Sequence, residues 1–311
     1  MRSVVAIVGP TAIGKSELAL ALAEKFGGEI VSADSRQVYR FMDIGTAKPS
    51  PQQQIGVPHH LIDLLDPEQE FSLALYQRLA IQAIEAILER GHLPFLVGGS
   101  GLYVWSVLEG WKIPEVPPDH DLRHHLESRA QYEGGLSLYQ ELEAIDPEAA
   151  RQIDWRNLRR VIRALEVCQA TGVPFSQLQN KQPPDFDTLI IGLTTGREDL
   201  YRRIDQRVDR MIEQGLVAEI MGLLDKGYGL DLSALSSLGY RQIGLFLEGR
   251  LTLDVAIQQI KFETHRFARH QFAWFRANDK RIHWFDVRQD FMSQAIEMVG
   301  NFVRQVEKVK S

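Results

Sequence analysis

Residues Gly9–Ser16 read GPTAIGKS, and this stretch decides the fold of the 311-residue chain. It matches the phosphate-binding loop pattern G-x-x-x-x-G-K-[ST] at every fixed position. The apolar, β-branched run Val4–Val8 before it predicts a buried strand, and Glu17–Phe26 after it predicts a helix. A strand, a glycine loop and a helix in this order predict an α/β fold with a P-loop NTPase-like core, in which helices flank a parallel sheet.

The same loop predicts a phosphate site. Its glycines allow backbone N–H groups to approach phosphate oxygens, and the N-terminus of the following helix favours negative charge. Lys15 supplies a positive charge to the terminal phosphates, and the Ser16 hydroxyl can bind Mg²⁺. The loop alone does not indicate which phosphate compound it binds.

Bulk composition is that of an ordinary globular protein, with 44% apolar and 24% charged residues. Cys168 is the only cysteine, which excludes an internal disulfide and a cysteine-based zinc site. No apolar run approaches the ~20 residues that span a bilayer, and the N-terminus enters the first strand without a leader. We therefore expect a cytoplasmic protein with no membrane partner. The net charge of −6 argues against a nucleic-acid partner, although a local basic stripe can bind phosphates on an acidic protein.

Two further loops are expected beside the phosphate site. Asp34–Gln37 follows a predicted strand at Glu29–Ala33, where an α/β sheet binds ligands; the alternative is that Asp34 only caps a helix. Gly98–Ser100 follows the predicted strand Leu93–Val97, and no Asp stands there to hold Mg²⁺ as in nucleotide hydrolases. Ser100 can contact a substrate, or the segment is only a turn before a helix.

A change in the sequence pattern along the chain predicts two domains. Prolines break the chain near residues 114–118 and 183–184, and the residues between lack strand-like runs. We expect a core domain of residues 1–118 and 183–311 and a helical insertion of residues 119–182. In the insertion, arginines at spacings of three and four predict one basic helix face, which is either an RNA-binding surface or a solvated one; they are Arg156, Arg159, Arg160 and Arg163.

The C-terminal half carries further basic segments. Arg207 lies on a predicted helix of mixed charge over Arg197–Gln214, and either reaches the phosphates or is solvated. A helix over Thr252–Ala277 interleaves basic and aromatic residues, a pattern that suits nucleic-acid contact or core packing. His59 and His60 are adjacent, so on a strand they point to opposite faces and do not share a metal ion easily.

Taken together, eight motifs in order resemble the tRNA dimethylallyltransferase (IPP transferase) family of the bacterial type, from about residue 3 to 287. The motifs read GPTAIGKS, VSADSRQVY, MDIGTAKP, VPHHLIDLLDP, LVGGSGLY, RRVIRALEV, LGYRQ and THRFARHQFAWFR. The resemblance implies transfer of a dimethylallyl group from dimethylallyl diphosphate to the exocyclic amine of the adenine 3′-adjacent to the anticodon. It implies tRNA and dimethylallyl diphosphate as partners, Mg²⁺ as cofactor, and no need for ATP. A monomer is expected.

Catalytic and donor-site roles follow from the resemblance. Asp34 would accept the amine proton, Ser100 would contact the tRNA near the reacting base, and Arg207 would close over the diphosphate. Ser16 would be the metal ligand. The diphosphate would be bound by the whole loop, Gly9, Pro10, Thr11, Ala12, Ile13, Gly14, Lys15 and Ser16.

The resemblance also implies a set of tRNA contacts. Asp34, Ser35, Arg36 and Gln37 would surround the flipped base, together with Ser100. The insertion would grip the anticodon stem-loop, and the LGYRQ motif would lie near the substrate channel. The residues implied are Arg123, Arg159, Arg160, Val161, Ile162, Arg163, Gly239, Tyr240 and Arg241.

The sequence departs from the family pattern at a few positions. Ser100 stands where Thr is usual, so the hydroxyl is kept. Arg156-Asn157 stands where Asn-Asp is common, and His265 and His270 replace residues that are often Arg. Histidine is only partly charged near neutral pH, so phosphate contacts there would be weaker.

Other functions stay open from the residues alone. A small-molecule P-loop kinase, with the insertion as its lid, predicts phosphate transfer from ATP. An adenine-nucleotide isopentenyltransferase predicts a free nucleotide as acceptor. A non-catalytic RNA-binding protein predicts that Asp34→Ala leaves every role intact.

Overall fold

The computed structural model describes residues 2–178 and 180–309. The chain forms two compact units, Met1–Leu108 with Asp185–Ser311, and Glu109–Pro184. The sequence-based boundaries were 118/119 and 182/183, so the proline-containing segment 114–118 falls in the second unit instead of the core. We describe each unit by itself.

In the described part of the core unit, six parallel strands form one sheet in the order β3-β2-β4-β1-β5-β6. From β1 the chain runs outward to β2 and β4 on one side and later to β5 and β6 on the other, so ligands are expected at the carboxyl end of β1. The strands are β1 (Ser3–Val8), β2 (Gly28–Ser32), β3 (His59–His60), β4 (Leu93–Gly98), β5 (Asp187–Thr194) and β6 (Ile282–Asp286).

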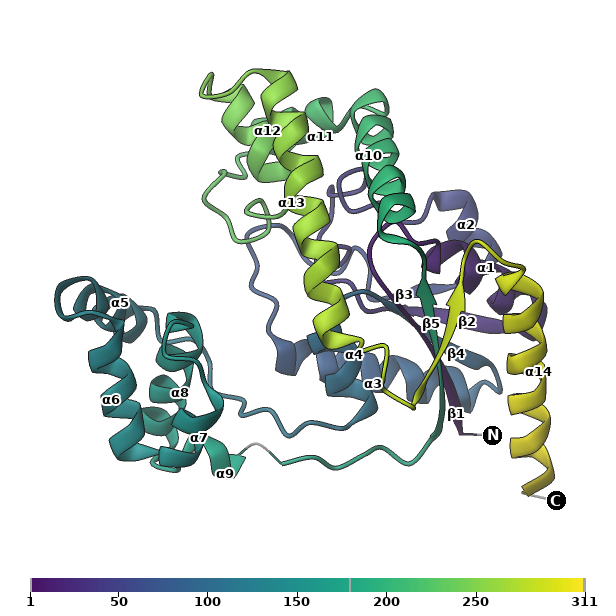
Figure 1. The fold of residues 1–311 in the computed structure, drawn as a ribbon, viewed down its shortest axis with the longest axis horizontal. Helices are drawn as coiled ribbons and strands as arrows, with labels where there is room; N and C mark the ends of the chain where they lie inside the picture. Colours follow the sequence, from purple (N-terminus) through teal and green to yellow (C-terminus); the bar gives the residue numbers. More distant parts are fainter. Residues whose placement is uncertain (1, 179, 310–311) are drawn as a thin grey trace. The chain divides into compact units, whose positions relative to one another are not determined.

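The central strands are buried on both faces, which explains their continuous apolar runs. Every residue of β1 is buried, and Val5 and Ile7 pair with Phe95 and Val97 of β4. On one face lie α1 (Lys15–Phe26) and α14 (Phe291–Val309), and on the other α3 (Leu73–Glu89) and α4 (Gly101–Leu108) (Figure 1). Ser72 caps α3, because its hydroxyl accepts a hydrogen bond from Leu75 N–H. This is the predicted α/β, P-loop NTPase-like core.

A second hydrophobic cluster of the core unit lies beyond the sheet. It joins α10 (Arg197–Glu213), α11 (Leu216–Asp225), α12 (Tyr240–Leu247) and α13 (Leu253–Trp274) to residues 38–44. Helix α13 ends three residues before the predicted Ala277. One further short helix, α2 (Pro51–Gly56), follows the MDIGTAKP segment.

The Glu109–Pro184 unit is helical, as predicted, with an apolar core of its own. Leu138, Leu142 and Val161 are fully buried in that core. Its helices are α5 (His120–Glu133), α6 (Gly135–Ile145), α7 (Pro147–Gln152), α8 (Leu158–Thr171) and α9 (Phe175–Leu178).

Candidate active site

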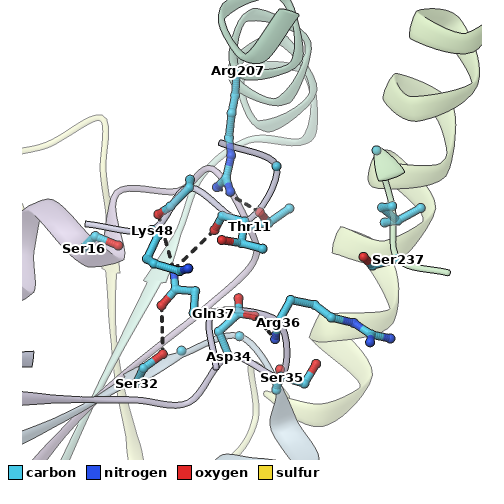
Figure 2. Close-up of a pocket in the computed structure, with 18 of the residues that line it drawn as sticks. Thr11, Ser16, Ser32, Asp34, Ser35, Arg36, Gln37, Lys48, Arg207 and Ser237 are labelled. Atoms are coloured by element: carbon cyan, nitrogen blue, oxygen red, sulfur yellow. Dashed lines mark hydrogen bonds between the residues drawn. The ribbon is translucent and has the colours of Figure 1, made fainter. Parts of the chain in front are cut away.

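A cavity of about 690 Å³ opens beside the P-loop of the core unit. Figure 2 shows its side chains, with Arg207 reaching from α10 toward Thr11 and the Asp34–Gln37 turn nearby. The cavity therefore brings together the predicted donor-site and base-contacting residues. Those that line it are Thr11, Lys15, Ser16, Asp34, Ser35, Arg36, Gln37, Ser100, Arg207, Gly239, Tyr240 and Arg241.

The P-loop backbone depends on its glycines. Gly9 has φ +141°, and a Cβ there would lie 2.6 Å from the Leu193 carbonyl oxygen of β5. Gly14 has φ +106° and stands immediately before α1. Between them, Ala12 adopts φ 62°, an uncommon conformation for a residue with a side chain. Local sequence thus produces the tight curve that points the loop at the cavity.

Lys15 is half-buried at the first turn of α1, and its ammonium donates a hydrogen bond to the Pro10 carbonyl, 2.7 Å away. Burial lowers the pKa of Lys15, the positive charge of Arg207 adds to this effect, and the carboxylate of Asp34 opposes both, so that the pKa is about 7. The carboxylate of Asp34 compensates this positive charge only in part, and a phosphate ligand would supply further negative charge.

Arg207 faces Lys15 across the cavity from α10. Its Nη1 donates to the Thr11 hydroxyl at 3.2 Å. Burial lowers the pKa of Arg207, and Asp34 raises it. Of the two sequence-based alternatives for this residue, the structure supports reach toward the P-loop.

Asp34 occupies a turn, so the alternative that it caps a helix is wrong. Its Oδ1 accepts a hydrogen bond from Arg36 N–H at 2.8 Å, within a turn at residues 35–38. Arg36 Nη1 donates to the Ser233 carbonyl at 2.9 Å. The Gln37 amide accepts from the Ser32 hydroxyl and donates to the Thr46 and Ala47 carbonyls. The turn therefore presents one carboxylate to the cavity from a fixed frame.

Ser100 lines the cavity and also begins α4, because its carbonyl accepts from Tyr103 N–H and Val104 N–H. The segment is thus a turn before a helix, and contact of Ser100 with a substrate stays a prediction. A Cβ at Gly98 would lie 2.1 Å from the Ala33 carbonyl oxygen, so the segment needs glycine there to pass this close to the Asp34 turn.

The LGYRQ motif contains both buried and exposed side chains. The Tyr240 ring is fully buried, and its hydroxyl donates to Glu219 at 2.6 Å. Gly239 has φ +89° and begins α12. The exposed Arg241 pairs with Glu263 at 2.7 Å. A direct RNA contact from this motif is therefore open to Arg241, whereas the Tyr240 side chain packs.

Two anchoring residues escaped the sequence reasoning. Glu219 accepts hydrogen bonds from three successive backbone N–H groups, those of Asp43, Ile44 and Gly45. Gln271 of α13 contacts both the P-loop and Gly99. Gln271 lies inside the quoted motif THRFARHQFAWFR, but nothing in a linear pattern identifies its partners.

The arginine group of the insertion splits in the structure. Arg156 lies before α8 and pairs with Asp154 at 2.8 Å, so the prediction that it shares a helix face with the other arginines is wrong: Asn157 caps the helix and ends the periodicity there. Arg159 and Arg160 are exposed at the first turn of α8.

The other insertion residues serve the unit itself. Arg123 and Arg163 both bind the buried carboxylate of Glu166, at 2.8 Å and 2.6 Å. Val161 and Ile162 are buried in the apolar core, so their side chains pack within the unit, and the implied contact of these two residues with tRNA stays a prediction.

Metal-binding capacity is limited in the described residues. No group of three or more His, Cys, Asp or Glu side chains is placed to hold a metal among them. His59 lines the cavity, whereas His60 pairs with Glu29 at 2.6 Å, which confirms that the two point apart. The Ser16 hydroxyl is exposed at the start of α1. One hydroxyl suits Mg²⁺, which takes most of its ligands from phosphates and water.

No helix in residues 2–178 and 180–309 has the length and apolar character needed to cross a bilayer.

Comparison with known sequences is consistent along the chain. The profile of the family described as IPP transferase matches residues 37–278, and that of Isopentenyl transferase matches residues 2–62. The chain is 53% identical over 305 residues to a tRNA dimethylallyltransferase of Thermomicrobium roseum, covering 98% of this chain and 92% of the relative. It is 55% identical over 303 residues to one from a Roseiflexus species, covering 97% and 99%.

Solved structures agree. A full-length tRNA isopentenylpyrophosphate transferase from Bacillus halodurans aligns with a TM-score of 0.71 and 43% identity, covering 100% of this chain and 99% of that one. A eukaryotic dimethylallyltransferase described as acting on tRNA aligns with a TM-score of 0.84 and 28% identity, covering 98% and 80%.

Proposed function

The chain belongs to the IPP transferase family, and from that premise we propose that it is a tRNA dimethylallyltransferase whose donor is dimethylallyl diphosphate. It moves the dimethylallyl group to the exocyclic amine of the adenine 3′-adjacent to the anticodon. The observation that carries this proposal is the juxtaposition, around one cavity, of Lys15 from the P-loop, Arg207 from α10 and the carboxylate of Asp34.

The chemistry follows from those groups. The adenine amine nitrogen bonds to C1 of the dimethylallyl group while the C1–O bond breaks and diphosphate leaves with the electron pair. Lys15 and Arg207 stabilise the charge that develops on the leaving oxygen. Asp34 accepts the proton from the amine, which makes a poor nucleophile more reactive.

The acceptor base must leave its stack to reach a cavity. Flipping a base costs a few kcal/mol and is least costly for an unpaired one, as in an anticodon loop. The Asp34–Gln37 turn and Ser100 line the cavity that would receive the base. Exposed Arg159 and Arg160 offer phosphate contacts on the insertion.

Magnesium is part of the proposal. The Ser16 hydroxyl would hold Mg²⁺ together with diphosphate oxygens and water. When bound, the ion would supply charge neutralisation to the leaving group.

We also propose that the enzyme works as a monomer in the cytoplasm, beside its tRNA.

Incubation with radiolabelled dimethylallyl diphosphate, tRNA and Mg²⁺, without ATP, tests the function. We expect label in tRNAs with adenine 3′ of the anticodon, and none when that adenine is replaced. AMP in excess should not compete. Label in AMP would identify an adenine-nucleotide transferase, and ATP-dependent phosphate transfer would identify a kinase; either result would overturn the proposal.

A further inference from the structure

Gln271 is a buried polar side chain at the junction of three elements of the donor site. It lies on α13 with 4% of its surface exposed. Its Oε1 accepts a hydrogen bond from Thr11 N–H at 2.8 Å, and its Nε2 donates to the Gly99 carbonyl at 3.0 Å. One amide thus joins α13 to the P-loop and to the segment after β4.

The partners of this amide select glutamine chemically. Thr11 N–H is a donor and the Gly99 carbonyl an acceptor, so the side chain must carry one acceptor and one donor at the same reach. Packing is equally tight, because a Cβ at Gly99 would lie 2.2 Å from Gln271 Nε2. Glutamate would set an oxygen against the Gly99 carbonyl, and methionine would remove the partner of the buried Gly99 carbonyl and of the partly buried Thr11 N–H.

The bond to Thr11 N–H has a further consequence. That N–H and the Pro10 carbonyl belong to the same peptide group, and the Pro10 carbonyl accepts the hydrogen bond from Lys15 Nζ. The Thr11 hydroxyl accepts from Arg207 Nη1. Gln271 therefore holds the Pro10–Thr11 peptide group to which both cations are connected. Lys15 bonds to its carbonyl, and Arg207 bonds to the side chain of Thr11.

We propose that Gln271 is a positioning residue, which places Lys15 and Arg207 for diphosphate by holding the Pro10–Thr11 peptide. The inference rests on the proposed function for the identity of the donor. A hydrogen bond at the N–H of a peptide also polarises its carbonyl, which strengthens the bond to Lys15. The peptide would otherwise be free to turn its N–H toward the ligand, as P-loop amides do.

Gln271→Met is the central variant, because it keeps the length of the side chain and removes both hydrogen bonds. Gln258→Met is the matched control, since Gln258 is an exposed glutamine on the same helix. Gln271→Glu keeps the acceptor for Thr11 N–H and loses the donor. For each variant we would measure kcat/KM with dimethylallyl diphosphate, the Kd of inorganic diphosphate, the Kd of tRNA and the thermal midpoint.

Gln271→Met should lower kcat/KM about 10²-fold, because small misplacements of catalytic groups have effects of this size. Diphosphate binding should weaken about tenfold, while the tRNA Kd changes less than about threefold. Gln271→Glu should lie between Gln271→Met and wild type, and Gln258→Met should match wild type. If Gln271→Met weakened tRNA binding as much as diphosphate binding and also lowered the thermal midpoint, a packing role would replace the proposal.

A double-mutant cycle with Lys15→Ala tests the route. If Gln271 acts through Lys15, the fold-loss of kcat/KM in the double variant Gln271→Met with Lys15→Ala should be smaller than the product of the fold-losses in the two single variants. A fold-loss equal to the product of the two single fold-losses would overturn the proposed coupling.

The outcomes separate the two proposals. If the wild-type chain transfers no dimethylallyl group, the proposed function fails, whereas the Kd of inorganic diphosphate still tests Gln271. If the wild type is active and Gln271→Met resembles Gln258→Met, the function stands and the role of Gln271 is wrong.

Discussion

The donor cavity of the core unit and the arginine-rich face of the insertion use positive charge in opposite ways. In the cavity, Lys15 and Arg207 are partly buried, and the carboxylate of Asp34 acts on the charge of both. In the insertion, Arg123 and Arg163 neutralise the buried Glu166, and Arg159 and Arg160 lie exposed. An arginine or lysine in a motif therefore indicates ligand binding only after its internal partners are known.

The largest effect is expected at Asp34. Asp34→Asn keeps the shape of the turn and removes the proton acceptor, so prenyl transfer should fall about 10²–10⁴-fold. Single-turnover kinetics with saturating tRNA measures the loss, and filter binding should show tRNA affinity mostly retained. A variant with full activity would exclude Asp34 as the base and would favour a non-catalytic reading of the cavity.

Lys15→Ala should come next. Loss of one charged donor at a developing oxyanion lowers the rate about 10²–10³-fold. The Kd of tRNA should change little, because Lys15 lies in the donor cavity. Equal losses of transfer and tRNA binding would mean that the loop does not serve as a leaving-group site.

Glu166→Ala should destabilise the insertion by about 2 kcal/mol, below the range for fully buried pairs because Arg123 and Arg163 remain 34% and 29% exposed. Differential scanning calorimetry measures the change, with Glu143→Gln as the control at an exposed acid of the same unit. Unchanged stability would show that the Arg123–Glu166–Arg163 triad does not stabilise the unit.

The exposed arginines of the insertion, Arg159 and Arg160, are expected to contribute to tRNA binding. Arg159→Gln with Arg160→Gln should weaken tRNA binding about tenfold at low salt and reduce the slope of log Kd against log salt by about 2, since each phosphate contact contributes about 1. Arg156→Gln is the matched control, because Asp154 already neutralises that side chain. An unchanged slope in the double variant would leave the insertion without its proposed phosphate contacts.

The smallest effect is a dependence on pH. With the pKa of Lys15 at about 7 in the ligand-free protein, the ammonium is lost as the pH rises above 7, and a bound diphosphate restores it. Donor affinity should therefore be highest below pH 7 and fall by up to about tenfold per pH unit above it. Calorimetry in buffers of different ionisation enthalpy should show proton uptake on binding at pH 8.

Lys15→Ala is the control for this titration and should lack the proton uptake. The stability of the ligand-free protein should change with pH in the opposite direction. Because the unfolded chain binds the Lys15 proton more tightly, the free energy of unfolding rises between pH 7 and the ordinary lysine pKa of 10.5. Proton release on binding, or the same uptake in Lys15→Ala, would contradict the assignment.

Much of the core could be predicted because its signals are local. The apolar run of β1, the glycines of the P-loop and the serine that caps α3 each determine structure within a few residues. The position of Arg207 opposite Lys15 came only from the family resemblance, because helix periodicity alone left a solvated face equally open.

The rest depends on contacts between distant residues. Gln271 meets Thr11 across 260 positions and Gly99 across 172. The carboxylate of Glu166 resembles any other charge in a helical segment until its burial is seen. That burial gives Arg123 and Arg163 an internal ion-pair partner, while their contact with RNA stays a prediction. Hydrophobic packing likewise removes Val161 and Ile162 from the surface.

The most direct test of the leaving-group site compares two products of one reaction. Nucleosides from tRNA incubated with the protein, dimethylallyl diphosphate and Mg²⁺ would be identified by mass spectrometry, while released diphosphate is measured enzymatically in the same sample. We predict one isopentenyladenosine, 3′-adjacent to the anticodon, for each diphosphate released, with the initial rates of both lowered together in Lys15→Ala. Diphosphate release without modified adenosine, or modification only when ATP is added, would contradict the account.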